Sequence, residues 1–197
     1  MLVEVLEPSV LRMPELSDDA FFDFCASNDE YRIERTAEGR IIIMSGTGGE
    51  TGFRNSLLTS QLTTWAMADG RGRPFDSSTM FLLPNSAMRS PDAAWVSRIR
   101  LAKLTSSQKR KYLPLCPEFV VELVSPSDRL PAVSAKMLEW IENGVQLGWV
   151  LDPDEMRAYV YRIGQPVEVL DNPAILAGEG PVDGFILDFK MILDSEL

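Results

Sequence analysis

The chain has 197 residues, of which 45% are hydrophobic and 24% charged, a composition typical of a soluble globular protein with one domain of ordinary size. It contains no histidine, which excludes Ser-His-Asp and Cys-His nucleophilic sites, histidine-ligated zinc and any imidazole base. The net charge of −10 argues against a protein that simply coats nucleic acid, because that binding depends on neutralising phosphates. Any chemistry must therefore use carboxylates, lysines, hydroxyl groups or a hard metal ion.

The two cysteines, Cys25 and Cys116, lie far apart and lack CxxC spacing, so we interpret them as buried apolar residues rather than a zinc or redox pair. Residues 1–19 have no basic region and no long apolar run, so no signal peptide is expected. No stretch approaches about 18 uninterrupted apolar residues, so no transmembrane helix is expected either. The sequence predicts a cytoplasmic protein.

The first part of the chain predicts a helix, a β-hairpin and a second helix. Ser17 is a suitable N-cap for a helix that ends near residue 28. The strands YRIERT and RIIIMSG then lie around a turn at Glu38-Gly39. Apolar residues at helical spacing predict the second helix over about residues 50–68, which follows the glycine-rich SGTGGETG.

The rest of the chain predicts mainly strands, with a helix between two of them. Short strands are expected at about 73–76, 79–83 and 92–97, followed by a polar, basic segment with a short helix over 98–111. PEFVVELVS is a near-continuous apolar run and predicts a central strand buried on both faces. A helix within about 130–142 ends at Asn143-Gly144, and GWVLDP, MRAYVYR and PVEVL predict three more strands.

These elements together predict an α+β fold, in which a mixed β-sheet is flanked by α-helices. The tail 171–197 alternates turn residues with short apolar pieces and is assigned no regular element. With no internal repeat and no low-complexity tract, residues 1–197 are predicted to form a single domain.

Glu122 is a charged residue inside the most apolar of the predicted strands. Side chains alternate along a strand, so Glu122 shares one face of PEFVVELVS with Val120 and Val124. A buried carboxylate is costly unless it is paired or binds something. Two interpretations are open: a carboxylate near the strand end that is salt-bridged to an arginine, or a functional ligand or base.

Asp92 opens the predicted strand DAAWV, directly after Ser90-Pro91. Taken alone, Pro-Asp is a common turn-forming pair. If this strand lies beside that of Glu122, each of two neighbouring strand ends supplies one carboxylate, an arrangement suited to Mg²⁺, which prefers oxygen ligands. The two residues together therefore predict a metal site.

Lys136 and Glu50 are further candidates, each with a simple structural alternative. Lys136 is either a surface lysine whose alkyl chain packs along its helix, or an ammonium group that leans over the strand of Glu122. There it could pair with the carboxylates or orient a water. Glu50 lies in the first turn of a predicted helix, where it complements the helix dipole, and a glutamate aimed at the sheet from there could also be a metal ligand.

A basic stretch separates the strands of Asp92 and Glu122. No acidic residue lies between Asp92 and Glu118, whereas six basic residues do: Arg98, Arg100, Lys103, Lys109, Arg110 and Lys111. An acidic protein can present one basic face of this kind. The stretch is either a solvated loop or a surface that contacts a phosphate backbone.

The order Pro91-Asp92, a gap of thirty residues, then Glu122 in an apolar strand resembles the PD-(D/E)XK nuclease superfamily. A longer ordered set is similar to the Uma family, a bacterial branch of that superfamily whose members are labelled restriction endonucleases. The set comprises Ser90-Pro91-Asp92-Ala93-Ala94-Trp95, PEFVVELVSPSD, Lys136, Asn143-Gly144-Val145, GWVLDP and YVYR. The resemblance covers roughly residues 40–190, and residues 1–39 add an N-terminal helix and the start of a hairpin.

The resemblance implies a restriction-endonuclease-like core, a homodimer, and Mg²⁺ or Mn²⁺ as cofactor. It implies that Asp92, Glu122 and the main-chain carbonyl of Leu123 hold the metal. Glu50 matches the helix-borne acidic position of the superfamily, which implies a further ligand. In such sites the metal polarises a phosphodiester and lowers the pKa of an attacking water, and a lysine assists.

The chain departs from the superfamily at the lysine two residues after the glutamate, since that position is Val124. In the Uma family the lysine lies on the following helix, which fits Lys136. Pro131 is tolerated only in the first turn of that helix, so the start of the helix and the aim of Lys136 are open.

Two functions follow as hypotheses. The first is a metal-dependent endonuclease that hydrolyses phosphodiester bonds of DNA, with Asp92, Glu122 and Lys136 as catalytic residues. The second is a catalytically silent dimer that keeps the fold as a binding or scaffold module, which the net charge and Val124 favour. Because the sequence has no helix-turn-helix or zinc-finger motif, a nuclease of this kind could depend on a partner protein for DNA recognition.

Overall fold

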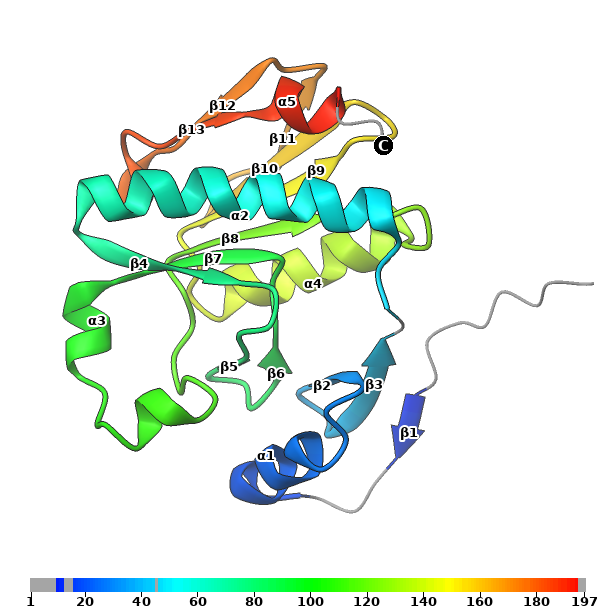
Figure 1. The fold of residues 1–197 in the computed structure, drawn as a ribbon, viewed down its shortest axis with the longest axis vertical. Helices are drawn as coiled ribbons and strands as arrows, with labels where there is room; N and C mark the ends of the chain where they lie inside the picture. The colour runs from blue at the N-terminus through cyan, green and yellow to red at the C-terminus, as the bar shows by residue number, and fades with distance from the viewer. Residues whose placement is uncertain (1–9, 13–15, 45, 195–197) are drawn as a thin grey trace, which may run out of the picture.

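The structure is a computed structural model that describes residues 10–12, 16–44 and 46–194, with side chains from residue 16 onward. Its described part is an α+β fold with three β-sheets and five α-helices (Figure 1). The α+β class predicted from the sequence is confirmed. The expectation that the chain has no leader peptide falls largely on residues outside this part.

Five α-helices and two short 3-10 helices occur in the described residues. They are α1 (Asp18–Ala26), α2 (Gly49–Asp69), α3 (Arg98–Ala102), α4 (Leu130–Glu142), α5 (Phe189–Leu193), η1 (Gln108–Arg110) and η2 (Gly180–Val182). The three longer helices lie where the sequence predicts them. None of the helices in this part of the chain is both long enough and apolar enough to cross a membrane.

The central sheet has six strands in the order β11-β10-β9-β8-β7-β4. Their bounds are β4 (Gly72–Asp76), β7 (Ala93–Ser97), β8 (Phe119–Leu123), β9 (Leu147–Asp152), β10 (Arg157–Arg162) and β11 (Glu168–Asp171). The pair β8–β9 is parallel and the other pairs are antiparallel, so the sheet is mixed, as predicted. All five residues of β8 are buried, which confirms the prediction of a strand covered on both faces.

The sequence predicts one sheet, whereas the structure divides the strands among three. A second sheet has the order β1-β3-β2-β6-β5, and a third pairs β12 with β13. Their bounds are β1 (Val10–Arg12), β2 (Arg32–Arg35), β3 (Arg40–Met44), β5 (Phe81–Leu82), β6 (Met88–Arg89), β12 (Ile175–Ala177) and β13 (Ile186–Asp188). Most strands that the sequence missed or overextended have two or three residues, too few to produce an alternating pattern.

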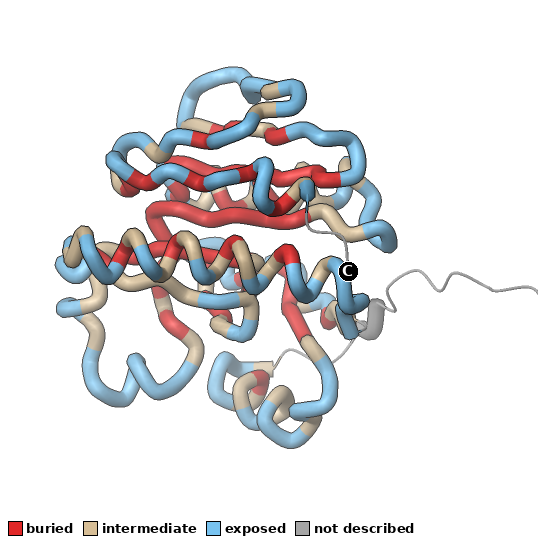
Figure 2. Tube along the Cα trace, turned by 45° about the horizontal axis from the view of Figure 1, so that its top comes forward, coloured by how far each residue is buried: buried red, intermediate tan, exposed pale blue. Residues whose placement is uncertain are grey.

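Two helices cover opposite faces of the central sheet. On β8, Phe119, Val121 and Leu123 belong to the core that includes α2, whereas Val120 belongs to the core that includes α4. In Figure 2 the central strands are buried, whereas the long helix in front of them, α2, is exposed along its outer side. A Cβ atom at Gly148 would lie 2.2 Å from Sδ of Met137, so the side chain of Met137 fills the space that the glycine leaves on β9. This close packing places the adjacent Lys136 near the end of β8.

The second sheet meets the central one through a short connection. β6 pairs with β2 at Arg35–Met88 and leads, through residues 90–92, directly into β7. Side chains from α1, β2 and β6 form a separate small core that includes Phe21, Ile33 and Met88. The hairpin β2–β3 is therefore packed beside the segment that carries Asp92.

Candidate functional site

Asp92 and Glu122 lie at the same end of two neighbouring strands. β7 pairs antiparallel with β8, and the last pair, Ala93–Val121, leaves Asp92 beside the end of β8. The main-chain N–H of Leu123 donates a hydrogen bond to Oδ2 of Asp92 at 2.7 Å. The expectation that these two strands are neighbours is thus confirmed, and the two carboxylates are brought together.

Glu122 is 4% exposed and points toward α4. The indole N–H of Trp140 donates to its Oε1 at 2.8 Å, and Nζ of Lys136 lies 3.1 and 3.2 Å from its two oxygens. Its cationic partner is therefore a lysine, not the arginine of the simpler alternative.

Lys136 turns inward from α4 and is not a surface lysine, since its side chain is 19% exposed. Besides Glu122, its ammonium group donates to the main-chain oxygen of Ser90 at 2.8 Å and lies 3.1 Å from Oε1 of Glu34. Pro131 falls in the first turn of α4, where a proline is tolerated. Lys136 thus supplies an ammonium group beside Glu122, while residue 124 is a valine.

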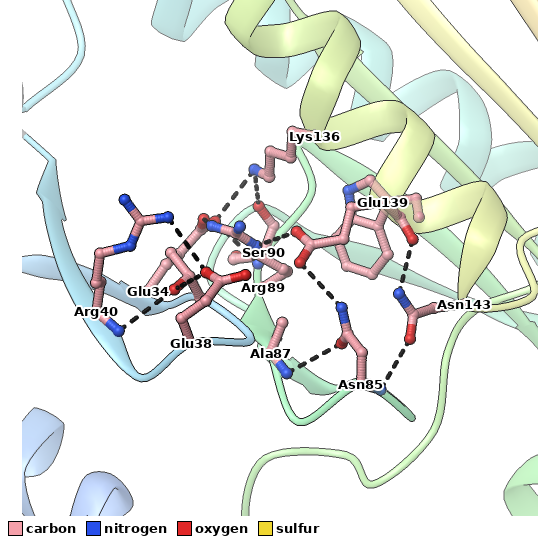
Figure 3. A network of polar contacts seen from close by, with 12 residues as sticks. Glu34, Glu38, Arg40, Asn85, Ala87, Arg89, Ser90, Lys136, Glu139 and Asn143 are labelled. Carbon is pink, nitrogen blue, oxygen red and sulfur yellow. Dashed lines mark hydrogen bonds and ion pairs between the residues drawn. The ribbon is translucent and has the colours of Figure 1, made fainter. Parts of the chain in front are cut away.

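Glu34 on β2 is a buried residue of the site that sequence reasoning missed (Figure 3). It is 2% exposed, and its Oε1 accepts a hydrogen bond from the N–H of Ser90 at 3.0 Å as well as contacting Lys136. Its Oε2 lies 3.1 Å from Arg89, which also donates to Glu139 on α4 at 2.6 Å. Burial works to raise the pKa of Glu34, but Lys136 and Arg89 outweigh it and lower the pKa.

The polar side chains around Asp92 lie farther from its carboxylate than those around Glu34 lie from theirs. Nδ2 of Asn55 on α2 is 3.4 Å from its Oδ1, and the guanidinium of Arg32 is 3.8 Å from the same oxygen. A separation of 3.8 Å is too long for a hydrogen bond. Arg32 instead donates to the main-chain oxygen of Ser90 at 3.2 Å, so its ion pair with Asp92 is a long one without a hydrogen bond.

The titration of the site follows from this burial. Burial, reinforced by the nearby charges of Asp92 and Glu34 and opposed by Lys136, raises the pKa of Glu122 to about 7. Burial also raises the pKa of Asp92. Burial acts to lower the pKa of Lys136, but the carboxylates around it prevail and raise the pKa, so the group stays an ammonium ion at neutral pH.

The raised pKa of Glu122 predicts that the metal-free protein loses stability as the pH rises. The folded state holds the proton of Glu122 more tightly than the unfolded chain does. The contribution of this proton to stability is complete below pH 4.5, the ordinary pKa of glutamate, and is lost as the pH approaches about 7. Denaturant unfolding at a series of pH values measures the fall in the free energy of unfolding. Glu122→Gln should flatten it, whereas Glu38→Gln, an exposed change on the β2–β3 hairpin, should not. An unchanged profile in Glu122→Gln would contradict the assignment.

The charges of the site suit a divalent cation. Hydrogen bonds and ion pairs connect four carboxylates with three cationic side chains: Glu34, Asp92, Glu122 and Glu139 with Arg32, Arg89 and Lys136. With every one of these groups ionised, the connected set carries one negative charge, and Asp92 and Glu122 are hard oxygen donors of the kind that Mg²⁺ prefers. The donor set fits a Mg²⁺ or Mn²⁺ ion.

Glu50 lies in the first turn of α2, as predicted, but 48% of its side chain is exposed and it pairs with Arg54 at 2.7 Å. Arg54 also contacts Asp154 at 3.2 Å. Within residues 16–44 and 46–194, no three acidic or thiol side chains are grouped so that they could hold a metal ion. The role of Glu50 as a further ligand stays a prediction, and it would require the carboxylate to leave Arg54.

The basic stretch divides into paired and unpaired side chains. Arg100 lies 3.5 Å from Glu118, and Lys111 lies 2.6 Å from Asp19. The other four of the predicted set, Arg98, Lys103, Lys109 and Arg110, have no ion pair within the described part of the chain. Two of them, Arg98 and Lys109, line a concavity of about 470 Å³ together with Arg73 of β4.

A single signal in the sequence could have indicated Glu34. In YRIERT, Glu34 and Arg35 are adjacent charged residues, and neighbours along a strand point to opposite faces. In a hairpin packed on one face, one of the two must therefore be turned toward protein. In the structure both are buried, and Arg35 pairs with Asp18 of α1 at 2.6 Å.

A profile of the Uma2 family, described as "Putative restriction endonuclease", matches residues 18–190. A comparison with curated proteins finds no match. A crystal structure from Anabaena variabilis, described as "a putative nuclease belonging to DUF820", superposes with a TM-score of 0.70 at 23% identity, covering 83% of this chain and 90% of that one. At this identity the likeness supports a shared fold. The family match begins at residue 18, not near 40, and so includes β2; because it spans well over half of the chain, the chain belongs to the Uma2 family.

Proposed function

We propose that the protein is a metal-dependent endonuclease that hydrolyses phosphodiester bonds of DNA. The observation that carries the proposal is the meeting of Asp92, Glu122 and Lys136, which come from three separate elements, at one end of β7 and β8. Membership of a family of restriction endonucleases supports the nuclease class.

Asp92 and Glu122 would hold the Mg²⁺ or Mn²⁺ ion, with the main-chain carbonyl of Leu123 as the third ligand. The N–H and C=O of one strand residue point to the same side of the strand. Since the N–H of Leu123 donates to Asp92, its carbonyl lies on the side where β7 has ended and no strand covers it. This position supports the carbonyl as a ligand beside both carboxylates.

When bound, the ion polarises the scissile phosphodiester and lowers the pKa of a water. Lys136 contributes a permanent positive charge next to Glu122, where it donates hydrogen bonds and stabilises negative charge on the phosphate. Because its pKa is raised, Lys136 does not act as a base that removes a proton from water. Asn55 helps to orient Asp92 from the opposite face of the sheet.

The unpaired basic residues would contact the DNA backbone away from the scissile bond. β7 separates Asp92, at its start, from Arg98, just after its end, and five strand residues span about 17 Å. Arg98, Lys109 and Arg73 would hold a phosphate of the same duplex at their concavity. Arg100 and Lys111 contribute less, because carboxylates neutralise them.

A homodimer is the active form in this proposal. A two-fold symmetric dimer presents two centres of opposite orientation, one for each strand of a duplex. Sequence recognition by a partner protein would explain why no known base-reading motif is recognised in the chain.

Cleavage of supercoiled plasmid by the purified protein tests the proposal. We expect nicked and linear products with Mg²⁺ or Mn²⁺ and none in the presence of a chelator. Sedimentation of the same sample measures whether the protein is a dimer. Absence of metal-dependent products from several plasmids, together with no heat of Mg²⁺ binding in calorimetry, would favour a catalytically silent scaffold.

A further inference from the structure

We propose that Glu34 is the residue that positions Lys136. The strand β2, which lies outside the central sheet, thereby contributes a positioning residue to the catalytic site. The inference rests on the proposed function and deepens it. It assigns to Glu34 no contact with substrate or metal, only an action through Lys136 and the segment that carries Asp92.

Lys136 has three N–H donors and three acceptor groups around it. They are the carboxylate of Glu122, the main-chain oxygen of Ser90 and the carboxylate of Glu34. If Glu122 turns its charge toward a metal ion, Glu34 is the one remaining carboxylate in contact with the ammonium group in the described structure. Glu34 therefore keeps Lys136 at the strand end in the state where the reaction takes place.

Glu34 and Lys136 together also hold the peptide that leads to Asp92. Glu34 accepts the N–H of Ser90 at 3.0 Å, and Lys136 donates to the C=O of the same residue at 2.8 Å. Ser90 is buried, and Pro91 is the only residue between it and Asp92. Glu34 and Lys136 thus bind both main-chain polar groups of Ser90, with Arg32 as a further donor to its C=O, which limits the positions that Asp92 can adopt.

The carboxylate of Glu34 is itself held from the other side. Its second oxygen contacts Arg89 at 3.1 Å, and Arg89 donates to Glu139 of α4 at 2.6 Å. Arg89 and Lys136 thus approach Glu34 from two directions, as Figure 3 shows for the labelled side chains. A glutamate buried with both oxygens in use has little freedom to move, which is what a positioning group requires.

The test uses Glu34→Gln, which keeps the shape and can still accept the N–H of Ser90 but removes the charge that holds Lys136. We expect kcat for DNA cleavage to fall by about 10- to 100-fold with KM within about twofold, the usual cost of losing an outer partner of a metal site. We also expect the Nζ signal of Lys136, one of five lysines, to shift in NMR of protein with ¹⁵N-labelled lysine.

Two matched variants separate positioning from a general structural effect. Glu38→Gln makes the same change at an exposed site on the same hairpin and should leave kcat and the Lys136 signal unchanged. Glu139→Gln removes the other carboxylate of Arg89 without touching Lys136. If Glu139→Gln and Glu34→Gln lower kcat in proportion to their loss of Tm, the role of Glu34 is merely structural and the proposal is wrong.

Further readouts test the role of Glu34 independently of whether the protein cleaves DNA. If Glu34→Gln does not fold, Glu34→Asp keeps the charge but withdraws the carboxylate by about 1.5 Å, and it should show the same fall in kcat and shift of the Lys136 signal. If the wild type cleaves no DNA, the NMR signal alone decides. A Lys136 signal unmoved by the change at residue 34 would overturn the proposal, and a shifted one supports it.

Discussion

Replacing Asp92 or Glu122 by its amide is expected to lower metal-dependent DNA cleavage by roughly 10³-fold or more. The amide has nearly the shape of the carboxylate but lacks its charge, so we expect the fold to be kept while a proposed metal ligand is lost. Calorimetry with Mg²⁺ should show a matching loss of affinity in both variants. Cleavage is measured as the rate of plasmid nicking at saturating metal.

Asp171→Asn is the matched control for these changes. Asp171 is an exposed carboxylate on β11 that pairs with Arg157 at 2.8 Å, remote in the sheet order from β7 and β8. The control should cleave at the wild-type rate. A rate for Asp92→Asn or Glu122→Gln equal to that of Asp171→Asn would show that the carboxylates at the ends of β7 and β8 are not catalytic.

Replacing Lys136 with Met is expected to lower the free energy of unfolding by about 3–5 kcal/mol, because one partner of a buried ion-paired group is removed. Glu122 then has no cationic partner among the described residues, and Glu34 keeps only Arg89. Mg²⁺ should restore part of the loss, since an ion that binds only the folded state stabilises it by mass action. Denaturant unfolding with and without Mg²⁺ measures both effects.

Lys190→Met serves as the comparison, because Lys190 is exposed on α5 and pairs only with Asp194 at 3.2 Å within the described residues. Exposed pairs of this kind contribute about 0–1 kcal/mol. If both variants lose the same small amount, Lys136 is not holding buried negative charge. If Mg²⁺ stabilises neither variant nor the wild type, the proposed metal site is wrong.

Lys136 brings an ammonium group to Glu122 from a helix, although residue 124 is a valine. Val124 follows β8 directly, and its N–H is bonded to the main-chain oxygen of Leu151 on β9. The cationic group instead comes from the second turn of α4, which crosses the face of the sheet that carries Glu122.

The sequence by itself determined the features that depend on local patterns. The three longer helices, the strands of the central sheet and the alternation along β8 follow from periodicity, which acts over a few residues. Glu122 stood out for the same reason, since a charge among Val120 and Val124 requires a partner. Asp92 became a candidate through its pairing with Glu122 at two neighbouring strand ends, since Pro-Asp alone is a common turn pair.

Only the tertiary structure decided which groups meet at these carboxylates. Glu34 contacts Ser90 and Lys136, which lie 56 and 102 positions further along the chain, and nothing in a local pattern encodes contacts over such separations. The pairing of Arg100 and Lys111 with acids, and of Glu50 with Arg54, likewise depends on how elements pack. A charged residue within an apolar pattern indicates that a partner is required. Which residue is that partner depends on the packing, which brings distant elements together and excludes water between them.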